Sequence, residues 1–247
     1  MAVNQMFSKL VDAIFPPNCV LCGEPGQSHL PGSGRSIDLC LPCQEDFIAN
    51  SACCFQCAIP LPLAKDEARA RCGECLKTTP AFTHTCAPYI YQWPLDKLVQ
   101  VFKFKGNLAS GRVLSSLLTQ AIATDPSSEA QIEAIIPIPL HPGRLRERGF
   151  NQAALLAADI AKQLSIPLIQ NTLIRQKPSP PQAGLDADCR QKNIKGAFSI
   201  NKKNSLPGSV ALVDDVMTTG STLREAAKTL LDAGVQRVDC WVIARTP

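Results

Sequence analysis

The sequence predicts an α/β protein in which a parallel β-sheet flanked by helices follows a cysteine-rich N-terminal module. Ten of the twelve cysteines lie between Cys19 and Cys86, whereas beyond Ala87 short apolar strands alternate with amphipathic helices. Such alternation is typical of a parallel sheet covered by helices on both faces. A chain of 247 residues has room for a small module and a full-sized domain. We therefore expect one domain at 1–86 and a second at 87–247.

Four C-x-x-C pairs dominate the N-terminal module. Each such turn presents two thiolates to one metal ion, and two turns complete the tetrahedron that zinc prefers. The gap from Cys22 to Cys40 is 17 residues and that from Cys57 to Cys72 is 14, close to zinc-ribbon spacing. We expect two structural zinc sites, each with four cysteine ligands from sequential pairs, and a crossed pairing is the alternative. The predicted ligands are Cys19, Cys22, Cys40, Cys43, Cys54, Cys57, Cys72 and Cys75.

Three other residues in this module are candidate ligands. Cys53 stands next to Cys54 and can replace it, while His84 and Cys86 are spare candidates that we expect to be structural. Polar residues interrupt the apolar ones at the N-terminus, so no secretory signal is predicted. No stretch approaches the roughly 20 apolar residues of a membrane helix. We therefore expect a cytoplasmic protein without membrane insertion, whose cysteines hold metal rather than form disulfides.

Apolar spacing predicts the remaining elements. Leu114, Leu117, Leu118 and Ala121 repeat at helical spacing, whereas Val210–Val213 is a continuous apolar run typical of a buried strand. A short packing helix is expected at the N-terminus, and a basic loop after the second strand. The expected helices are Met1–Phe15, Leu95–Phe104, Leu108–Ala123, Asn151–Leu164 and Ser221–Ala233. The expected strands are Tyr89–Tyr91, Ala134–Ile138, Leu168–Gln170, Thr172–Ile174, Val210–Val213 and Val238–Ala244.

Two acids and a threonine-rich turn follow the strand Val210–Val213. Adjacent carboxylates at Asp214 and Asp215 suit the two hydroxyls of a sugar diol, or a hydrated Mg²⁺ ion. The next segment opens a helix, where backbone N–H groups and hydroxyls form a cradle for an anion. This segment consists of Thr218, Thr219, Gly220, Ser221 and Thr222. Because ligands of open α/β sheets bind at the carboxyl ends of strands, the combination predicts a site for a ribose 5-phosphate.

Other phosphate-binding motifs are excluded, and the charge distribution agrees with an anionic ligand. The sequence lacks the lysine of a Walker motif after Gly220 and has no G-x-G-x-x-G. Between Pro142 and Lys203 there are eleven Lys or Arg against four Asp or Glu, although the net charge of the whole chain is only +4. A polyphosphate or a nucleic acid would suit this basic segment, and a solvated basic face is the alternative.

The stretch Val210–Thr222 resembles the phosphoribosyl pyrophosphate (PRPP) signature of type I phosphoribosyltransferases. With the cysteine pairs, the segment Pro137–Gln152 and the segment Gln182–Phe198, nearly the whole chain resembles the ComF family. The resemblance implies a type I phosphoribosyltransferase fold behind a double zinc ribbon. It also implies that Asp214 and Asp215 hold the ribose with Mg²⁺ nearby, and that the threonine turn holds the 5′-phosphate. The residues implied at the pyrophosphate or in its lid are Lys103, Arg144, Arg146, Arg148 and Gln182.

The resemblance implies a function in DNA uptake, natural transformation and recombination, with contacts to single-stranded DNA and to the proteins of these processes. Aromatic residues make up only 5% of the chain, so such binding is expected to depend on phosphate contacts. The alternative is an active phosphoribosyltransferase with an unidentified acceptor. Several purine-salvage relatives carry an acid at the position of Thr218, so purine salvage is not expected. Asp214 and Asp215 are the best catalytic candidates in that case.

Overall fold

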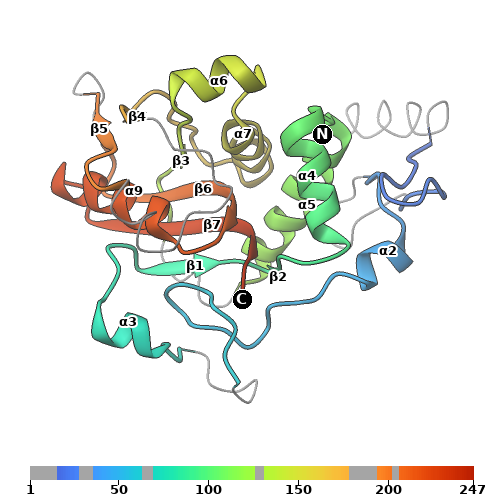
Figure 1. The fold of residues 1–247 in the computed structure, drawn as a ribbon, viewed down its shortest axis with the longest axis horizontal. Coiled ribbons are helices and arrows are strands. Elements are labelled where there is room, and N and C mark those ends of the chain that lie inside the picture. The colour runs from blue at the N-terminus through green and yellow to red at the C-terminus, as the bar shows by residue number, and fades with distance from the viewer. Residues whose placement is uncertain (1–15, 28–35, 63–68, 126–130, 178–193, 202–205) are drawn as a thin grey trace.

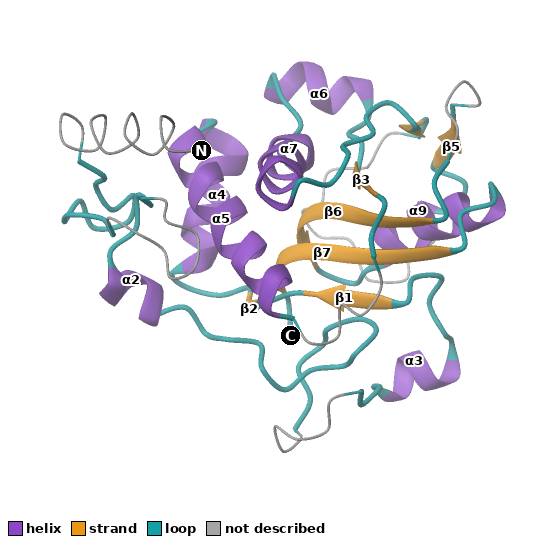
Figure 2. Ribbon diagram, turned by 180° about the vertical axis from the view of Figure 1, so that it is seen from behind, coloured by secondary structure: helices purple, strands orange, loops and turns teal. Residues whose placement is uncertain are grey.

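A five-stranded parallel sheet lies at the centre of the molecule (Figures 1 and 2). The computed structural model describes residues 16–27, 36–62, 69–125, 131–177, 194–201 and 206–247. The strand order is β1-β7-β6-β3, and β2 continues alongside β7 after β1. The strands are β1 (His84–Cys86), β2 (Tyr89–Ile90), β3 (Ala134–Pro137), β6 (Ser209–Met217) and β7 (Arg237–Arg245).

Helices cover both faces of this sheet, and alternate residues of the central strands pack against the helices on opposite faces. Val213 and Trp241 point into a core shared with α5 and α7, whereas Leu212 and Val242 point into a core shared with α9. Successive side chains of a strand face opposite ways, so a continuous apolar run is needed when both faces are buried. The helices are α4 (Leu95–Lys105), α5 (Leu108–Thr124), α7 (Gln152–Leu164) and α9 (Ser221–Asp232). The predicted parallel sheet with flanking helices is confirmed.

Several predicted boundaries were wrong. The strand at Val210–Val213 continues as β6 to Met217, because β7 pairs with it through Met217↔Arg245. Leu168–Gln170 contributes one bridge, Leu168 to Ile135, rather than a strand. The segment near Thr172 becomes β4 (Leu173–Arg175), which pairs antiparallel with an unpredicted strand, β5 (Phe198–Ile200), outside the central sheet.

The expected basic loop is a helix, α6 (Pro142–Arg148). Pro142 takes the first helical position, where its missing N–H removes no hydrogen bond. The His141 side chain accepts a hydrogen bond from the N–H of Gly143 at this end. Gly149 ends the helix at φ 79°, a left-handed conformation that glycine adopts without strain. These residues stabilise the two ends of a short helix that apolar spacing alone did not indicate.

The cysteine-rich module lies along both sides of the sheet rather than apart from it. Two short helices in its described part, α2 (Leu41–Glu45) and α3 (Gly73–Lys77), lie near opposite ends of the molecule (Figures 1 and 2). Strand β1 lies within the segment predicted to form the first domain, yet it pairs with β7. Among the described residues, no helix combines the length and apolarity required to cross a membrane. The N-terminal helix expected at Met1–Phe15 and the lid residue Gln182 lie outside the described residues.

Candidate functional site

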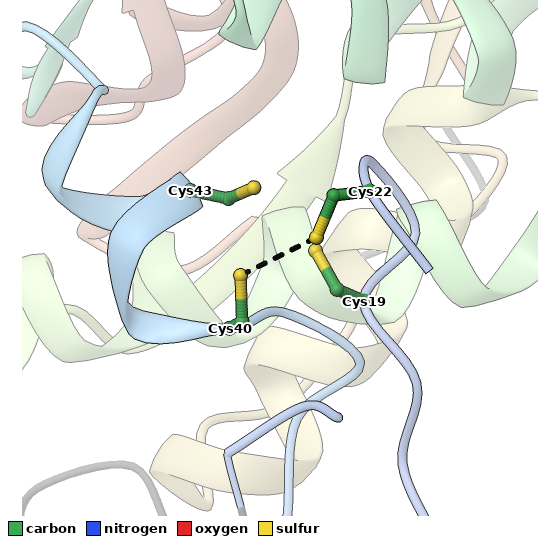
Figure 3. Close-up of side chains that lie close together, drawn as sticks. All are labelled: Cys19, Cys22, Cys40 and Cys43. Carbon is green, nitrogen blue, oxygen red and sulfur yellow. Dashed lines mark hydrogen bonds between the residues drawn. The ribbon is translucent and has the colours of Figure 1, made fainter. Parts of the chain in front are cut away.

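The eight predicted cysteine ligands form two groups of four. Cys19, Cys22, Cys40 and Cys43 form the first group, and Cys54, Cys57, Cys72 and Cys75 the second, with all sulfurs of a group within 4.8 Å of one another. Figure 3 shows the four sulfurs of the first group pointing toward a common centre. The sequential pairing is therefore the one that the structure adopts.

Sulfur distances agree with tetrahedral zinc. The Cys22 and Cys40 sulfurs are 3.6 Å apart, as are those of Cys57 and Cys72. A tetrahedron with Zn–S bonds of about 2.3 Å has edges of about 3.8 Å. Four thiolates leave no open coordination position, so the groups fit two structural zinc ions.

The structure selects Cys54 rather than Cys53. Cys53 lies outside both groups, and burial raises the pKa of its thiol to about 11, helped by the charge of Cys54. The backbone N–H of Cys72 donates to the Cys54 sulfur over 3.3 Å, which supports Cys54 as the ligand. Of the spare candidates, Cys86 is buried, and the Nε2 of His84 lies 3.5 Å from the Asp125 carboxylate. His84 and Cys86 belong to β1, so both serve the fold rather than a zinc site.

A separate cavity of about 230 Å³ opens at the carboxyl ends of β3 and β6. The predicted acid pair, the whole threonine turn, Lys103, Arg144 and Arg148 line it. Arg146, by contrast, does not line the cavity and is exposed. The sequence-predicted residues that the structure brings together are Lys103, Arg144, Arg148, Asp214, Asp215, Thr218, Thr219, Gly220, Ser221 and Thr222.

The acid pair lines this cavity together with Lys103. The Nζ of Lys103 lies 2.8 Å from one carboxylate oxygen of Asp215, which is only 5% exposed. Burial is the largest influence on Lys103 and would lower its pKa, but the charge and hydrogen bond of Asp215 and the charge of Asp214 together raise the pKa. Burial and the neighbouring Asp215 charge raise the pKa of Asp214 to about 7. One lysine therefore balances one acid, and the second acid titrates near neutrality.

The threonine turn between β6 and α9 is held in a defined shape. Gly220 has φ 75° and is the N-cap residue of α9, and a side chain there would be strained. The hydroxyls of Thr219 and Ser221 lie 2.6 Å apart, and both Thr218 and Thr219 are exposed. The α9 N-terminus adds the positive end of a helix dipole. Hydroxyls, backbone N–H groups and this dipole together suit a phosphate.

Helix α6 presents only two of its three arginines to the cavity. The Nη1 of Arg148 donates to the Gln152 side chain over 2.9 Å, and its guanidinium lies 5.4 Å from the Phe104 ring centre. Gln152 is buried and its amide also reaches the Lys103 carbonyl, 3.4 Å away. These contacts fix the direction of Arg148. Guanidinium groups bind phosphates through paired hydrogen bonds, so this wall suits an anionic group.

Tyr91 and Arg175 are among the cavity residues that were not predicted from the sequence. Arg175 ends β4, and its guanidinium lies 5.5 Å from the Phe198 ring centre. Its buried Nε has no hydrogen-bond partner within the protein part that is described. Burial lowers the pKa of Arg175 from its ordinary value, but an arginine stays charged at neutral pH. The sequence signal that would have indicated Arg175 as a cavity residue is its position, as a cation, at the end of a predicted strand.

Asn151 serves as a cap. Its side chain accepts from the N–H of Ala153 over 3.1 Å at the start of α7, and its amide donates to the Ile138 carbonyl over 3.0 Å. Asn151 therefore ties α7 to the end of β3, where the cavity begins.

The cavity thus combines an acid pair, a hydroxyl-rich turn and three guanidinium groups. This arrangement is complementary to a sugar that carries phosphates at both ends.

Known families and proteins match most of the chain. The family described as "Double zinc ribbon domain" matches residues 10–87, and "Phosphoribosyl transferase domain" matches residues 151–247. Competence protein F of Haemophilus influenzae is 38% identical over 232 residues, which cover 92% of this chain and 96% of that protein. DNA utilization protein YhgH of Salmonella typhimurium is 31% identical over 236 residues, or 94% and 98% of the two chains.

Among solved structures, adenine phosphoribosyltransferase from Leishmania donovani is 18% identical, with a TM-score of 0.36 over 58% of this chain and 55% of that one. The family matches, the parallel sheet and the two four-cysteine groups confirm the predicted fold class. It is a phosphoribosyltransferase-type α/β domain with an N-terminal double zinc ribbon.

Proposed function

Because this chain belongs to the ComF family, with a double zinc ribbon and a phosphoribosyltransferase domain, we propose that it binds PRPP with Mg²⁺ and acts in the uptake and use of DNA. One observation carries the ligand proposal: the acid pair, the threonine turn, two arginines of α6 and Arg175 of β4 line a single cavity. We also propose that residues 1–86 form the zinc module and 87–247 the ligand-binding domain, with β1 as a strand shared between them.

The two ends of PRPP are assigned to different walls of the cavity. The turn Thr218–Thr222 would hold the 5′-phosphate through hydroxyls and backbone N–H groups, and Asp214 with Asp215 would accept hydrogen bonds from the ribose hydroxyls. Arg144, Arg148 and Arg175 would neutralise the pyrophosphate. Mg²⁺ would supply further positive charge at the pyrophosphate, and carboxylate oxygens are the ligands that it prefers. Gln182 stays a predicted lid residue.

The DNA part of the proposal is supported by the names of the relatives and by exposed cations on the two helices that carry cavity residues. YhgH is named a DNA utilization protein. Arg146 is exposed on α6, and Lys105 is exposed in the last turn of α4. Exposed cations of this kind bind nucleic-acid phosphates, and such binding weakens steeply with salt. Single-stranded DNA is the nucleic acid that we propose, together with proteins of DNA uptake and recombination.

We place ligand binding above transfer chemistry. Thr218 opens the phosphate turn and carries no group able to accept a proton at neutral pH. Transfer would also need an acceptor pocket, and the described cavity is lined by groups that suit PRPP itself. Phosphoribosyl transfer to an acceptor, with release of pyrophosphate, is the alternative function.

Calorimetric titration tests the proposal directly. PRPP with Mg²⁺ should bind one site per chain, and a single-stranded oligonucleotide should bind with an affinity that falls as salt rises. A parallel assay for pyrophosphate released from PRPP, with and without candidate acceptors, tests the alternative. Absence of PRPP binding in the presence of Mg²⁺ would refute the proposed ligand, and acceptor-dependent release would favour the enzyme.

Only two of the α6 arginines should matter for the pyrophosphate. Arg144→Gln and Arg148→Gln should each weaken PRPP binding about tenfold, because each removes a charged hydrogen-bond donor from the cavity wall, about 1.5 kcal/mol or more. Arg146→Gln is the matched control: it removes the same charge from the same helix, but outside the cavity. Calorimetry on the three variants measures this, and an equal loss in all three would show a merely general effect of charge.

Binding of PRPP should also depend on the protonation of Asp214. Its pKa of about 7 exceeds its ordinary value of 3.8, so the folded protein holds a proton there that the unfolded chain releases. The contribution of this group to stability therefore falls as pH rises between those values. Ionisation is what the ribose hydroxyls require, so affinity should rise from pH 6 to pH 8. PRPP affinity is measured at each pH for wild type and for Asp214→Asn. The protonation of the ligand's phosphates affects both proteins alike, so only the part of the pH dependence that is due to Asp214 should disappear in the variant.

A further inference from the structure

Arg245 connects the second four-cysteine group to the threonine turn Thr218–Thr222, the proposed phosphate turn. It ends β7 and is only 5% exposed. Its Nε donates to the carbonyl of the zinc ligand Cys57 over 2.9 Å. Its Nη1 donates to the Met217 carbonyl over 3.2 Å and also to that of Thr218, the first residue of the turn. One buried side chain therefore holds the metal-binding knuckle and the proposed phosphate site against each other.

A second arginine makes a parallel connection from the other side of the turn. Arg224 lies in the first helical turn of α9, and its N–H donates to the Gly220 carbonyl over 2.9 Å. Its Nη2 lies 3.9 Å from the sulfur of the zinc ligand Cys75, and its Nη1 donates to the Thr78 carbonyl over 3.4 Å. The backbone of Arg224 is thus hydrogen-bonded to the turn, and its side chain contacts the second four-cysteine group.

Charge balance explains why cations meet here. Four thiolates around one Zn²⁺ ion carry a formal charge of −2, and no other group of the tetrahedron offsets it. Arg224 and Arg245 supply two positive charges, one at a ligand sulfur and one at a ligand carbonyl. A guanidinium keeps its charge at all physiological pH values and spreads its donors over a fixed plane. It can therefore contact zinc ligands and turn carbonyls together.

The first four-cysteine group faces a different part of the protein. Cys19 and Cys40 share a core with α4 and α5, whereas Cys54, Cys57 and Cys75 share a core with Met217 and Leu223, which flank the turn. We propose that the second zinc site, through Arg245 and Arg224 as positioning residues, sets the shape of the phosphate turn and thereby the affinity for a 5′-phosphate. The affinity half of this inference rests on the proposed function, while the effect on the shape of the turn does not.

Amide hydrogen exchange tests the coupling without any ligand. In Arg245→Gln, exchange in the segment 217–222 should rise at least about tenfold, and Arg224→Gln should act in the same direction. The control is Arg237→Gln, at the opposite end of β7, which leaves buried Asp239 without its 3.0 Å ion pair and so also destabilises that strand. Equal exchange in the turn of the Arg237 and Arg245 variants would overturn the proposal.

Two fragments of the proposed ligand then separate local from general effects. Arg245→Gln should weaken ribose 5-phosphate about tenfold, within the usual range of coupling between two sites. Pyrophosphate is assigned to the α6 wall, so its affinity for the Arg245→Gln variant should equal its affinity for the wild-type protein. Arg245→Lys should not restore the affinity, because one ammonium group cannot span the carbonyls of both segments. Equal weakening of both fragments would refute the positioning role. Failure of wild type to bind ribose 5-phosphate would refute the proposed function, and the exchange result would still decide the coupling.

The metal itself provides the last arm of the test. Cys75→Ser should raise exchange in the turn, whereas Cys43→Ser, which disrupts the first group, should leave it unchanged. Circular dichroism establishes that the domain of each variant stays folded. If neither variant changes exchange in the turn while the zinc content falls, the second site does not position it.

Discussion

Asp215→Asn should weaken binding of PRPP with Mg²⁺ by about a hundredfold or more. Asp215 is almost fully buried, and its carboxylate receives Lys103 at 2.8 Å and the N–H of Val216 at 2.7 Å. An amide of the same shape can still accept from Val216, but it loses the negative charge that would face the ribose and Mg²⁺ of the proposed ligand. Two charged hydrogen bonds of about 1.5 kcal/mol each correspond to this hundredfold loss. Calorimetric titration gives the affinity.

The matched control for Asp215→Asn is Asp232→Asn. Asp232 is exposed at the far end of α9, and its substitution makes the same change in net charge. The control variant should bind PRPP as wild type does. Thermal melting of both variants shows whether a loss of affinity reflects unfolding. Wild-type affinity in a folded Asp215→Asn protein would contradict the assignment of the acid pair to the ribose.

Local chemistry made the phosphate turn and acid pair predictable. Asp214 through Thr222 are consecutive in the chain, so their order alone places them at the end of one strand. The same holds for the zinc ligands, since each C-x-x-C turn folds locally. The choice between Cys53 and Cys54 was different, because it depends on which sulfur points toward Cys72, a contact that spacing does not determine.

The arginines of α6 show where a missed element changes the site. Interpreted as a loop, the segment offered three equivalent cations. As a helix, residues four apart lie on one face, which places Arg144 and Arg148 together and turns Arg146 away. Pro142 and Gly149 are the sequence signals that would have marked the two ends of this helix.

Contacts between distant segments could not be predicted from one sequence. Lys103 meets Asp215 across 112 residues, and Arg245 meets Cys57 across 188. Arg175 reaches the cavity because β4 leaves the central sheet and pairs with β5. Each of these depends on how the strands are ordered in space. That order places the carboxyl ends of β6 and β7 beside the second zinc group, and so creates the connection through Arg245.

Metal analysis should find two zinc ions per chain, and single cysteine substitutions should separate them. Cys43→Ser should leave one ion, because it opens the first four-cysteine group only, whereas Cys53→Ser should leave both. Cys53 is the stringent control, since it neighbours Cys54 but lies outside the group. Retention of both ions in Cys43→Ser, or loss of one in Cys53→Ser, would contradict the ligand sets.

Removal of both zinc ions should destabilise the protein more than any of the single substitutions. Structural zinc contributes about 10 kcal/mol or more to folding in small zinc modules. The two four-cysteine groups also contribute Cys19, Cys40, Cys54, Cys57 and Cys75 to the cores on the two faces of the sheet. Treatment with a strong chelator should therefore lower the melting temperature of the whole protein rather than release a separate module. Scanning calorimetry distinguishes these outcomes. We expect a single unfolding transition that shifts to lower temperature. If the unfolding transition of the sheet domain stayed unchanged while a separate transition of the zinc module disappeared, the zinc ribbon would fold independently of the sheet.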